Sequence, residues 1–388
     1  MNLEEAKRYT ELAYHLAGRF GGETWYSRIA VALYGVVNIW LEPMPHCLEK
    51  LKQAYQIGLG GGDMGFAMVN IACRCGMVAG VKKDSIFSPS HTFSVLCLVS
   101  QVNANIYLWN NIDRLPFSEL EAHARNLMER MKFLGQEKSA LRLLPLCQFC
   151  RSFMGQPDAT NPAGDVVWEK SDIDHQAFHQ GAMVGPDISN YYKMIVAYHF
   201  SDFVQAVSYA HLVRPMYLSL GTVLASCGRL YEALSLLETL HSQSTWIERL
   251  CRLRRIREHI HMFRYWSQHC PENFMGKLCL IQAELARYQG KIRRAQSKFY
   301  CAILHARDGG IVLEQALANE RAGKYHLELP PSSHNNHGDG DDNTCHTDAV
   351  AKGTEYLQEA IRLYRECGGM AKVHHLIKEV GHRVHLQV

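Results

Sequence analysis

The sequence predicts an all-α protein, an α-solenoid of stacked helical hairpins, and three observations lead to this fold class. Apolar residues recur at the helical period through most of the chain, with no sustained series of alternating strands. Most prolines, which break helix interiors, fall between these periodic segments. A helical-repeat signature lies near the C-terminus. The clearest periodic stripes are Leu230, Ala233, Leu234, Leu237 and Leu240; Leu253, Ile256, Ile260 and Phe263; and Leu357, Ala360, Ile361 and Tyr364.

The signature consists of Gly290, Ala295, Phe299 and Ala302. A tetratricopeptide hairpin has a glycine at its turn and an aromatic residue one turn before a small residue, so that the next hairpin can nest. The sequence therefore predicts a tetratricopeptide-like superhelix. An earlier copy comprises Tyr217, Leu220, Gly221, Gly228 and Ala233, and Gly228 is expected at a turn equivalent to Gly290, 62 residues before it. Two regular units of about 34 residues each would span more than these 62 residues, so degenerate repeats are expected.

The chain is expected to form one helical-repeat region over residues 1–388, and its parts differ in how regular the repeats are. Residues 1–160 are predicted as degenerate hairpins, with helix pairs at about 25–59, 63–108 and 118–154, and residues 161–188 as an irregular connection. Tetratricopeptide-like hairpins are predicted over 189–329 and 349–381. Between them, residues 330–348 are rich in Asp, His and Asn and have almost nothing to bury, which predicts a disordered inserted loop.

That loop contains the zinc-ligand types His334, His337, Cys345 and His346. No regular ligand spacing accompanies them, so no metal site is predicted there. No other cofactor site is predicted either.

Composition limits the possible partners and compartments. The 388 residues carry a net charge of only +3, too mild to indicate nucleic acid or an anionic membrane as a partner. The most apolar run, 29–41, is shorter than the ~20 residues of a membrane span. The 13 cysteines are odd in number and dispersed, which is typical of reduced thiols. We therefore expect a cytoplasmic protein without nucleic-acid or membrane partners.

Candidate catalytic patterns are weak. The segment Gly58–Asp63 is glycine-rich, but it lacks the Lys-Ser/Thr of a phosphate-binding loop and is better explained as a helix C-cap joined to an Asp N-cap. Cys147 and Cys150 form a single CxxC on an apolar helix, where core packing is expected.

His175 and His179 share the spacing of the zinc-protease helix motif. Gln176 stands where that motif has its catalytic Glu, so the general base is missing. The alternative to a non-catalytic protein is a helical metal-dependent enzyme that uses this pair with Asp172 or Asp174.

The most basic stretch, 248–264, is predicted to be a helix whose arginines face away from the apolar stripe. Arg254 and Arg255 are expected to project outward, with Arg252 and Arg257 nearer the flanks. These four arginines are the candidate partner-binding residues, for an acidic partner or a neighbouring domain. The alternative is a solvated helix face.

Several C-terminal segments resemble the helical region of multidomain signalling proteins. Those proteins join a serine/threonine kinase-like domain and a STAND/AAA-type ATPase to GAF and histidine kinase modules. The matching segments are 283–290 (AELARYQG), 314–320 (EQALANE), 355–364 (EYLQEAIRLY) and 371–376 (AKVHHL), with looser matches upstream. The resemblance implies a regulatory or sensing region that contacts an ATPase or kinase module. Because the chain lacks every catalytic motif of such modules, we expect a non-catalytic interaction scaffold rather than an enzyme.

Overall fold

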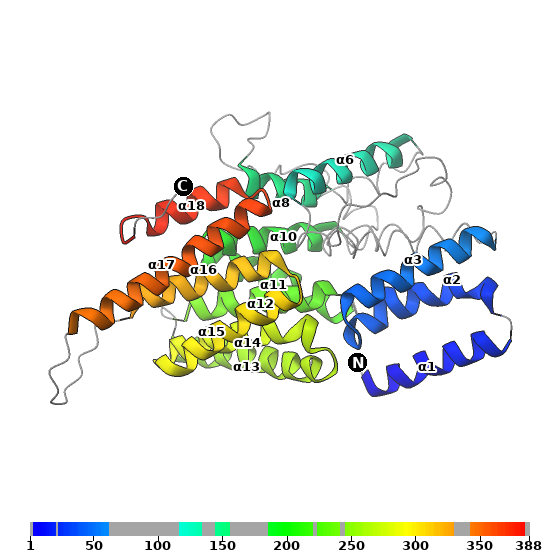
Figure 1. Cartoon of the computed structure of the whole chain (residues 1–388), viewed down its shortest axis with the longest axis horizontal. Helices are drawn as coiled ribbons and strands as arrows, with labels where there is room; N and C mark the ends of the chain where they lie inside the picture. Colours follow the sequence, from blue (N-terminus) through cyan, green and yellow to red (C-terminus); the bar gives the residue numbers. More distant parts are fainter. Residues whose placement is uncertain are drawn as a thin grey trace.

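A computed structural model of the chain describes residues 3–20, 22–61, 116–133, 144–155, 185–219, 223–240, 245–329 and 342–384. Every regular element within these ranges is helical, which confirms the all-α class (Figure 1). The N-terminal elements are α1 (Leu3–Arg19), α2 (Glu23–Ala32), the short helices η1 (Leu33–Val37) and η2 (Asn38–Trp40), and α3 (Met44–Gly60). The middle elements are α6 (Phe117–Phe133), α8 (Leu144–Met154), α10 (Gly185–His199), α11 (Phe203–Ser219) and α12 (Val223–Glu238). The C-terminal elements are α13 (Trp246–His269), α14 (Pro271–Tyr288), α15 (Ile292–Asp308), α16 (Val312–Glu328), α17 (Asp342–Glu366) and α18 (Met370–Val380).

Neighbouring helices from α10 to α18 pack against one another in chain order, as stacked hairpins do. Alternate helices also touch, because α12 packs on both α10 and α14, and α14 on α16. The sequence prediction of helix pairs is confirmed in this region, and the pairs at about 25–59 and 118–154 are also present as α2 with α3 and α6 with α8. The expected pair at 63–108 lies outside the described residues.

The chain does not run as an open row. Helix α8 packs on α10 and also on α18, the last helix of the chain (Figure 1). The backbone N–H of Phe117 donates to the carbonyl of Cys367 at 2.8 Å, and the Phe153 ring packs edge-on against His199. Helices that an open solenoid would separate are thus brought together.

The N-terminal helices α1 to α3 join this body through aromatic side chains. Trp40 stacks on Phe274 with ring centroids 5.3 Å apart and lies 4.8 Å from Trp266, so η2 is held against α13 and α14. Two hydrogen bonds reinforce the contact, from Asn273 to the Glu42 carbonyl and from the Leu3 N–H to the Tyr265 hydroxyl.

The apolar stripes form the core, as predicted. All members of the stripes on α12 and α17 are buried, as are Ile256, Ile260 and Phe263 on α13, while Leu253 is half-buried. The repeat signature is also confirmed locally. Gly290 has φ +67 at the turn between α14 and α15, and Ala295, Phe299 and Ala302 are buried on α15.

Two sequence expectations are wrong. Gly228 is not at a turn but lies buried inside α12, so the spacing to Gly290 does not measure a repeat. The helix continues through it because burial of neighbours such as Tyr231 outweighs the cost of one glycine, about 1 kcal/mol. The loop expected over 330–348 does not extend to 348, because α17 already begins at Asp342. Residues 330–341 lie outside the described ranges.

Candidate functional site: a charged pocket backed by buried ion pairs

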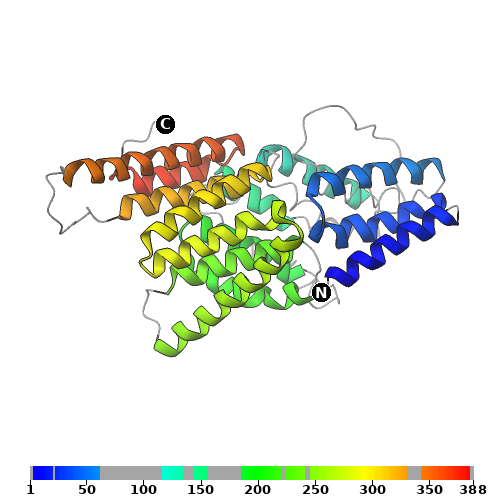
Figure 2. The same cartoon turned by 60° about the horizontal axis from the view of Figure 1, so that its bottom comes forward.

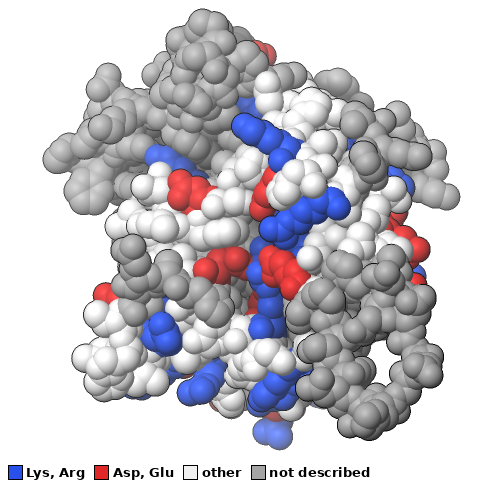
Figure 3. Space-filling view, turned by 90° about the vertical axis from the view of Figure 1, so that its left-hand side faces the viewer, with Lys and Arg blue, Asp and Glu red and all other residues white. Residues whose placement is uncertain are grey.

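A pocket of about 420 Å³ opens where α14 ends, α15 begins and α16 ends. Figure 3 looks onto this end of the molecule, where acidic and basic side chains alternate along a hollow in the surface. The turn at Gly290 positions the pocket, because it sends the chain from α14 back along α15. The lining consists of Leu237, Glu238, Glu284, Arg287, Tyr288, Gly290, Ile292, Tyr325, Glu328 and Leu329.

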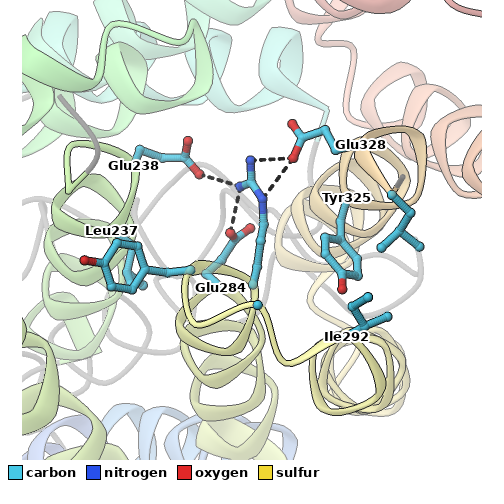
Figure 4. Close-up of a pocket in the computed structure, with 10 residues that line it drawn as sticks. Leu237, Glu238, Glu284, Ile292, Tyr325 and Glu328 are labelled. Atoms are coloured by element: carbon cyan, nitrogen blue, oxygen red, sulfur yellow. Dashed lines mark hydrogen bonds and ion pairs between the residues drawn. The ribbon is translucent and has the colours of Figure 1, made fainter. Parts of the chain in front are cut away.

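Arg287 lines the pocket and contacts three carboxylates from three helices, Glu238, Glu284 and Glu328, which Figure 4 labels. Its guanidinium donates to Glu238 of α12 at 3.1 Å, to Glu284 of its own helix at 3.0 Å and to Glu328 of α16 at 2.8 Å. Planar guanidinium groups suit such multiple contacts, because their donors form a rigid fork. Arg287 thus ties together the ends of three hairpins.

Arg321 of α16 lies behind the pocket and is almost fully buried. It donates to Glu284 and Glu238, so these two carboxylates are shared by two guanidinium groups. Burial by itself raises the pKa of Glu284, but the adjacent Arg321 and Arg287 outweigh that effect and hold it below its usual range. Glu284 is therefore ionised at neutral pH, and it fixes both arginines.

The pocket has an acidic excess. Three carboxylates (Glu238, Glu284 and Glu328) face two guanidinium groups (Arg287 and Arg321), which leaves one negative charge. Two tyrosine rings, Tyr288 and Tyr325, and the apolar side chains of the lining flank these charges. Carboxylates beside aromatic faces provide favourable surroundings for a cation. The lining residues include no Cys, His or Ser that would serve as a nucleophile or a neutral base.

A second buried cluster continues from α16 to α10, α17 and α18. Glu320 accepts hydrogen bonds from Lys324 at 2.7 Å, from Lys372 at 2.8 Å and from the Tyr364 hydroxyl at 2.7 Å. Lys372 also donates to the carbonyl of His199, at the C-terminal end of α10. Burial lowers the pKa of Lys372 to about 8, although Glu320 opposes this shift.

The candidate partner-binding arginines have different surroundings on α13. Arg254 and Arg257 are exposed, and Arg254 pairs with Glu258 at 3.3 Å. Arg252 donates to the carbonyl of Thr239 at 2.8 Å. Arg255 does not project outward as expected. It donates at 3.0 Å to Glu232, which is fully buried on α12.

Arg255 turns inward because Glu232 needs a partner when it is buried. Burial raises the pKa of Glu232, but the close His259, 3.1 Å away, and the hydrogen-bonded Arg255 lower it by more, to well below its usual range. This arginine anchors α13 to α12, whereas Arg254 and Arg257 are exposed.

The other sequence candidates lie either in the core or outside the described residues. Cys147 and Cys150 are buried in α8, as expected for core residues, and none of the nine described cysteines forms a disulfide. The histidines His175 and His179 of the alternative enzyme lie outside the described residues, as do His334 and His337. Across the ranges that the structure describes, no group of His, Cys, Asp and Glu side chains is arranged to hold a metal ion.

Sequence reasoning did not find the pocket or the ion pairs of α16. The charged residues of α16 give no signal of buried pairing, because Glu314, Glu320, Arg321, Lys324 and Glu328 share one face of the helix, as a solvent-facing stripe does. In the structure every residue from Leu313 to His326 except Gln315 is buried, so the charges on this face must be paired.

Comparison of the chain with protein-family models, with curated proteins and with solved structures finds no match. Among the helices described, none is both long enough and apolar enough to cross a bilayer.

Proposed function

We propose that this protein is a non-catalytic interaction scaffold whose pocket holds a cationic side chain of a partner protein or of a neighbouring domain. One observation carries the proposal. The pocket at the ends of α14 and α16 is open to solvent, has an excess carboxylate and is flanked by two tyrosine rings. A lysine or arginine side chain would satisfy both the charge and the aromatic faces.

Glu328 is the carboxylate best placed to meet such a side chain. It is the most exposed of the three, at 41% of its side-chain surface, whereas Glu284 is 2% exposed and already bound by two arginines. A partner cation can take over part of the contact between Glu328 and Arg287 without uncovering a buried charge. The inner carboxylates then serve to hold the pocket in shape.

The nature of the partner rests on the resemblance to signalling proteins. Two of the segments that carry this resemblance, 283–290 and 314–320, contribute Glu284, Arg287 and Gly290 to the pocket and Glu320 to the ion pairs behind it. We therefore propose an ATPase or kinase module of a signalling system as the partner, with the tetratricopeptide-like superhelix as its docking frame. The buried, unlinked thiols support a reducing, cytoplasmic setting.

A photo-crosslinking experiment tests this proposal. A benzoylphenylalanine replaces Ile292, which lines the pocket and is 46% exposed, and the full chain is irradiated in native extract. We expect a discrete crosslinked partner that disappears when Glu328→Lys is added. The matched control places the same group at Tyr300, which is 55% exposed on the same helix but does not line the pocket.

The proposal fails if position 300 captures the same protein as position 292, or if Glu328→Lys leaves the crosslink unchanged. Mass spectrometry of the crosslinked band identifies the partner. Capture of general chaperones alone would contradict the signalling role.

A further inference from the structure

We propose that the outer face of α13 is a second docking surface, which binds an acidic amphipathic helix of a partner protein. It goes beyond the proposed function, because no residue of α13 lines the pocket. The surface has two parts along one helix face, an apolar patch in the first turn and a row of basic side chains after it.

The apolar patch consists of Trp246, Ile247 and Leu250, which are 70%, 56% and 53% exposed. These are the first residues of α13, and Figure 2 shows this end of the helix projecting beyond the neighbouring helices at the lower left. A large aromatic side chain exposed together with two aliphatic ones is typical of an interaction site.

The basic row follows at helical spacing from that patch. Arg254, Arg257, His261 and Arg264 succeed Leu250 at intervals of three or four residues, so they lie on the same face, and all four are exposed. No carboxylate in the described part of the chain pairs with Arg257 or Arg264 in an ion pair. Six arginines and two glutamates give α13 a net charge of +4, more than the +3 of the whole chain.

The surface is held in place before any partner binds. The first turn of α13 exposes Trp246, Ile247 and Leu250, and a capping box stabilises it. The Thr245 hydroxyl accepts from the Glu248 N–H at 3.3 Å, and the Glu248 carboxylate accepts from the Thr245 N–H at 3.0 Å. On the inner side, Arg255 binds the buried Glu232. A preformed surface reduces the entropy lost on binding.

The dimensions and charges of this surface favour a protein helix as the occupant. An amphipathic helix with acidic side chains could place an apolar residue against Trp246 and carboxylates against Arg254 and Arg257. A nucleic acid would offer phosphates to the arginines but no aliphatic side chain to Trp246, Ile247 and Leu250, whereas an acidic amphipathic helix offers both.

The test uses fluorescein-labelled helical peptides with the full chain. One peptide carries leucines at a three–four spacing with glutamates elsewhere, and its partner peptide has lysine in place of each glutamate. Binding is followed by fluorescence anisotropy. We expect the acidic peptide to bind and the basic peptide not to bind, with Arg254→Glu/Arg257→Glu weakening the affinity at least about tenfold. Trp246→Ala should weaken it several-fold without a change in its salt dependence.

The matched control is Arg293→Glu/Arg294→Glu, which reverses two exposed arginines on α15 and should leave the affinity unchanged. Glu328→Lys in the pocket should also have no effect, so failure of this surface and failure of the pocket are distinguishable. Equal binding of the two peptides, or an intact affinity in the α13 variant, overturns the proposal. So does binding to anionic phospholipid vesicles in the absence of any binding to the acidic peptide.

Discussion

The carboxylate of Glu320 lies 2.8 Å from the ammonium of Lys372, and this buried pair joins α16 to α18 across 52 residues of sequence. Glu320 also binds Lys324, whereas Lys372 has Glu320 as its only carboxylate within ion-pair distance among the described residues. The acid is therefore the shared member of the cluster. Its removal leaves Lys372 without a carboxylate, although Lys324 keeps Glu379 at 2.8 Å, and removal of Lys372 leaves the acid paired with Lys324.

This asymmetry predicts an order of destabilisation. Glu320→Leu should lower the free energy of unfolding by about 3–5 kcal/mol, because breaking a buried pair leaves uncompensated charge. Lys372→Met should cost less, about 1–3 kcal/mol, because Lys324 still neutralises Glu320. Urea denaturation measures both values. The exposed Arg362, paired with Glu359 and Glu366, is the control, and Arg362→Met should change stability by less than about 1 kcal/mol. Equal losses at 320 and 372 would contradict this reading of the cluster.

The buried His199 predicts a loss of stability in acid. Burial, assisted by Lys372, lowers the pKa of its imidazole from 6.5 to about 3, so the folded chain leaves it neutral while the unfolded chain protonates it. The contribution of the neutral His199 to the free energy of unfolding is complete above pH 6.5 and is lost as the pH falls toward 3. Between pH 6 and pH 4, His199→Gln should reduce the slope of the unfolding free energy against pH. The reduction should reach at most about 1.4 kcal/mol per pH unit, which corresponds to the uptake of one proton on unfolding.

Chemical denaturation at several pH values measures that slope. Tyr300→Phe, a conservative substitution at an exposed position, should leave it unchanged. An identical slope in wild type and His199→Gln would show that the histidine is protonated in the folded state.

Two glycines should be sensitive to substitution for different reasons: Gly323 at the crossing of α16 and α17, and Gly290 at the turn between α14 and α15. A Cβ at Gly323 would lie 2.6 Å from Leu357 and 2.9 Å from the Gly353 carbonyl, so Gly323→Ala should destabilise by about 1–3 kcal/mol through overpacking. Gly290 has open space around its Cβ position but a φ of +67, so Gly290→Ala should cost about 1 kcal/mol through the backbone alone.

Substitution by Asn separates the two causes in thermal unfolding. Asn tolerates a positive φ, so Gly290→Asn should recover much of the loss, whereas Gly323→Asn should be worse than Gly323→Ala. The same outcome at both positions would contradict the assigned causes.

The described cysteines differ in burial, and this difference predicts that an alkylating reagent will modify them selectively. Burial raises the pKa of Cys147 to about 12 and that of Cys150 well above its ordinary value, so neither offers a thiolate at neutral pH. Cys251 is exposed on α13. Brief treatment of the native protein with iodoacetamide, followed by peptide mapping, should label Cys251 and spare the CxxC pair. Labelling of Cys147 as fast as Cys251 would show that α8 opens readily.

Sequence periodicity was sufficient for the helices and for most of the core. The stripes on α12, α13 and α17 were predictable because one helical face must be buried whatever it packs against. The register between hairpins was not predictable from the sequence, as the wrong prediction of a turn at Gly228 illustrates. Glycine marks a turn only where the chain needs a positive φ, and a single sequence does not reveal where a buried helix continues through it.

The pocket was beyond prediction for a related reason. Arg287 meets Glu238, 49 residues before it, and Glu328, 41 residues after it, and both distances depend on how three hairpins stack. The amphipathic pattern of 248–264 did indicate exposed arginines. It could not show that Arg255 would turn inward, because the reason lies on another helix, at Glu232.

The contact between Lys372 and the end of α10 spans 173 residues and limits how the architecture could be varied. In a row of hairpins that touch only their neighbours, units can be inserted or deleted with little effect on the rest. Here α18 meets both α8 and α10, so one extra hairpin between α11 and α17 would pull the last helix away from its partners. We therefore expect insertions in the connections between helices to be tolerated better than an added hairpin, because only the hairpin would have to open the closure.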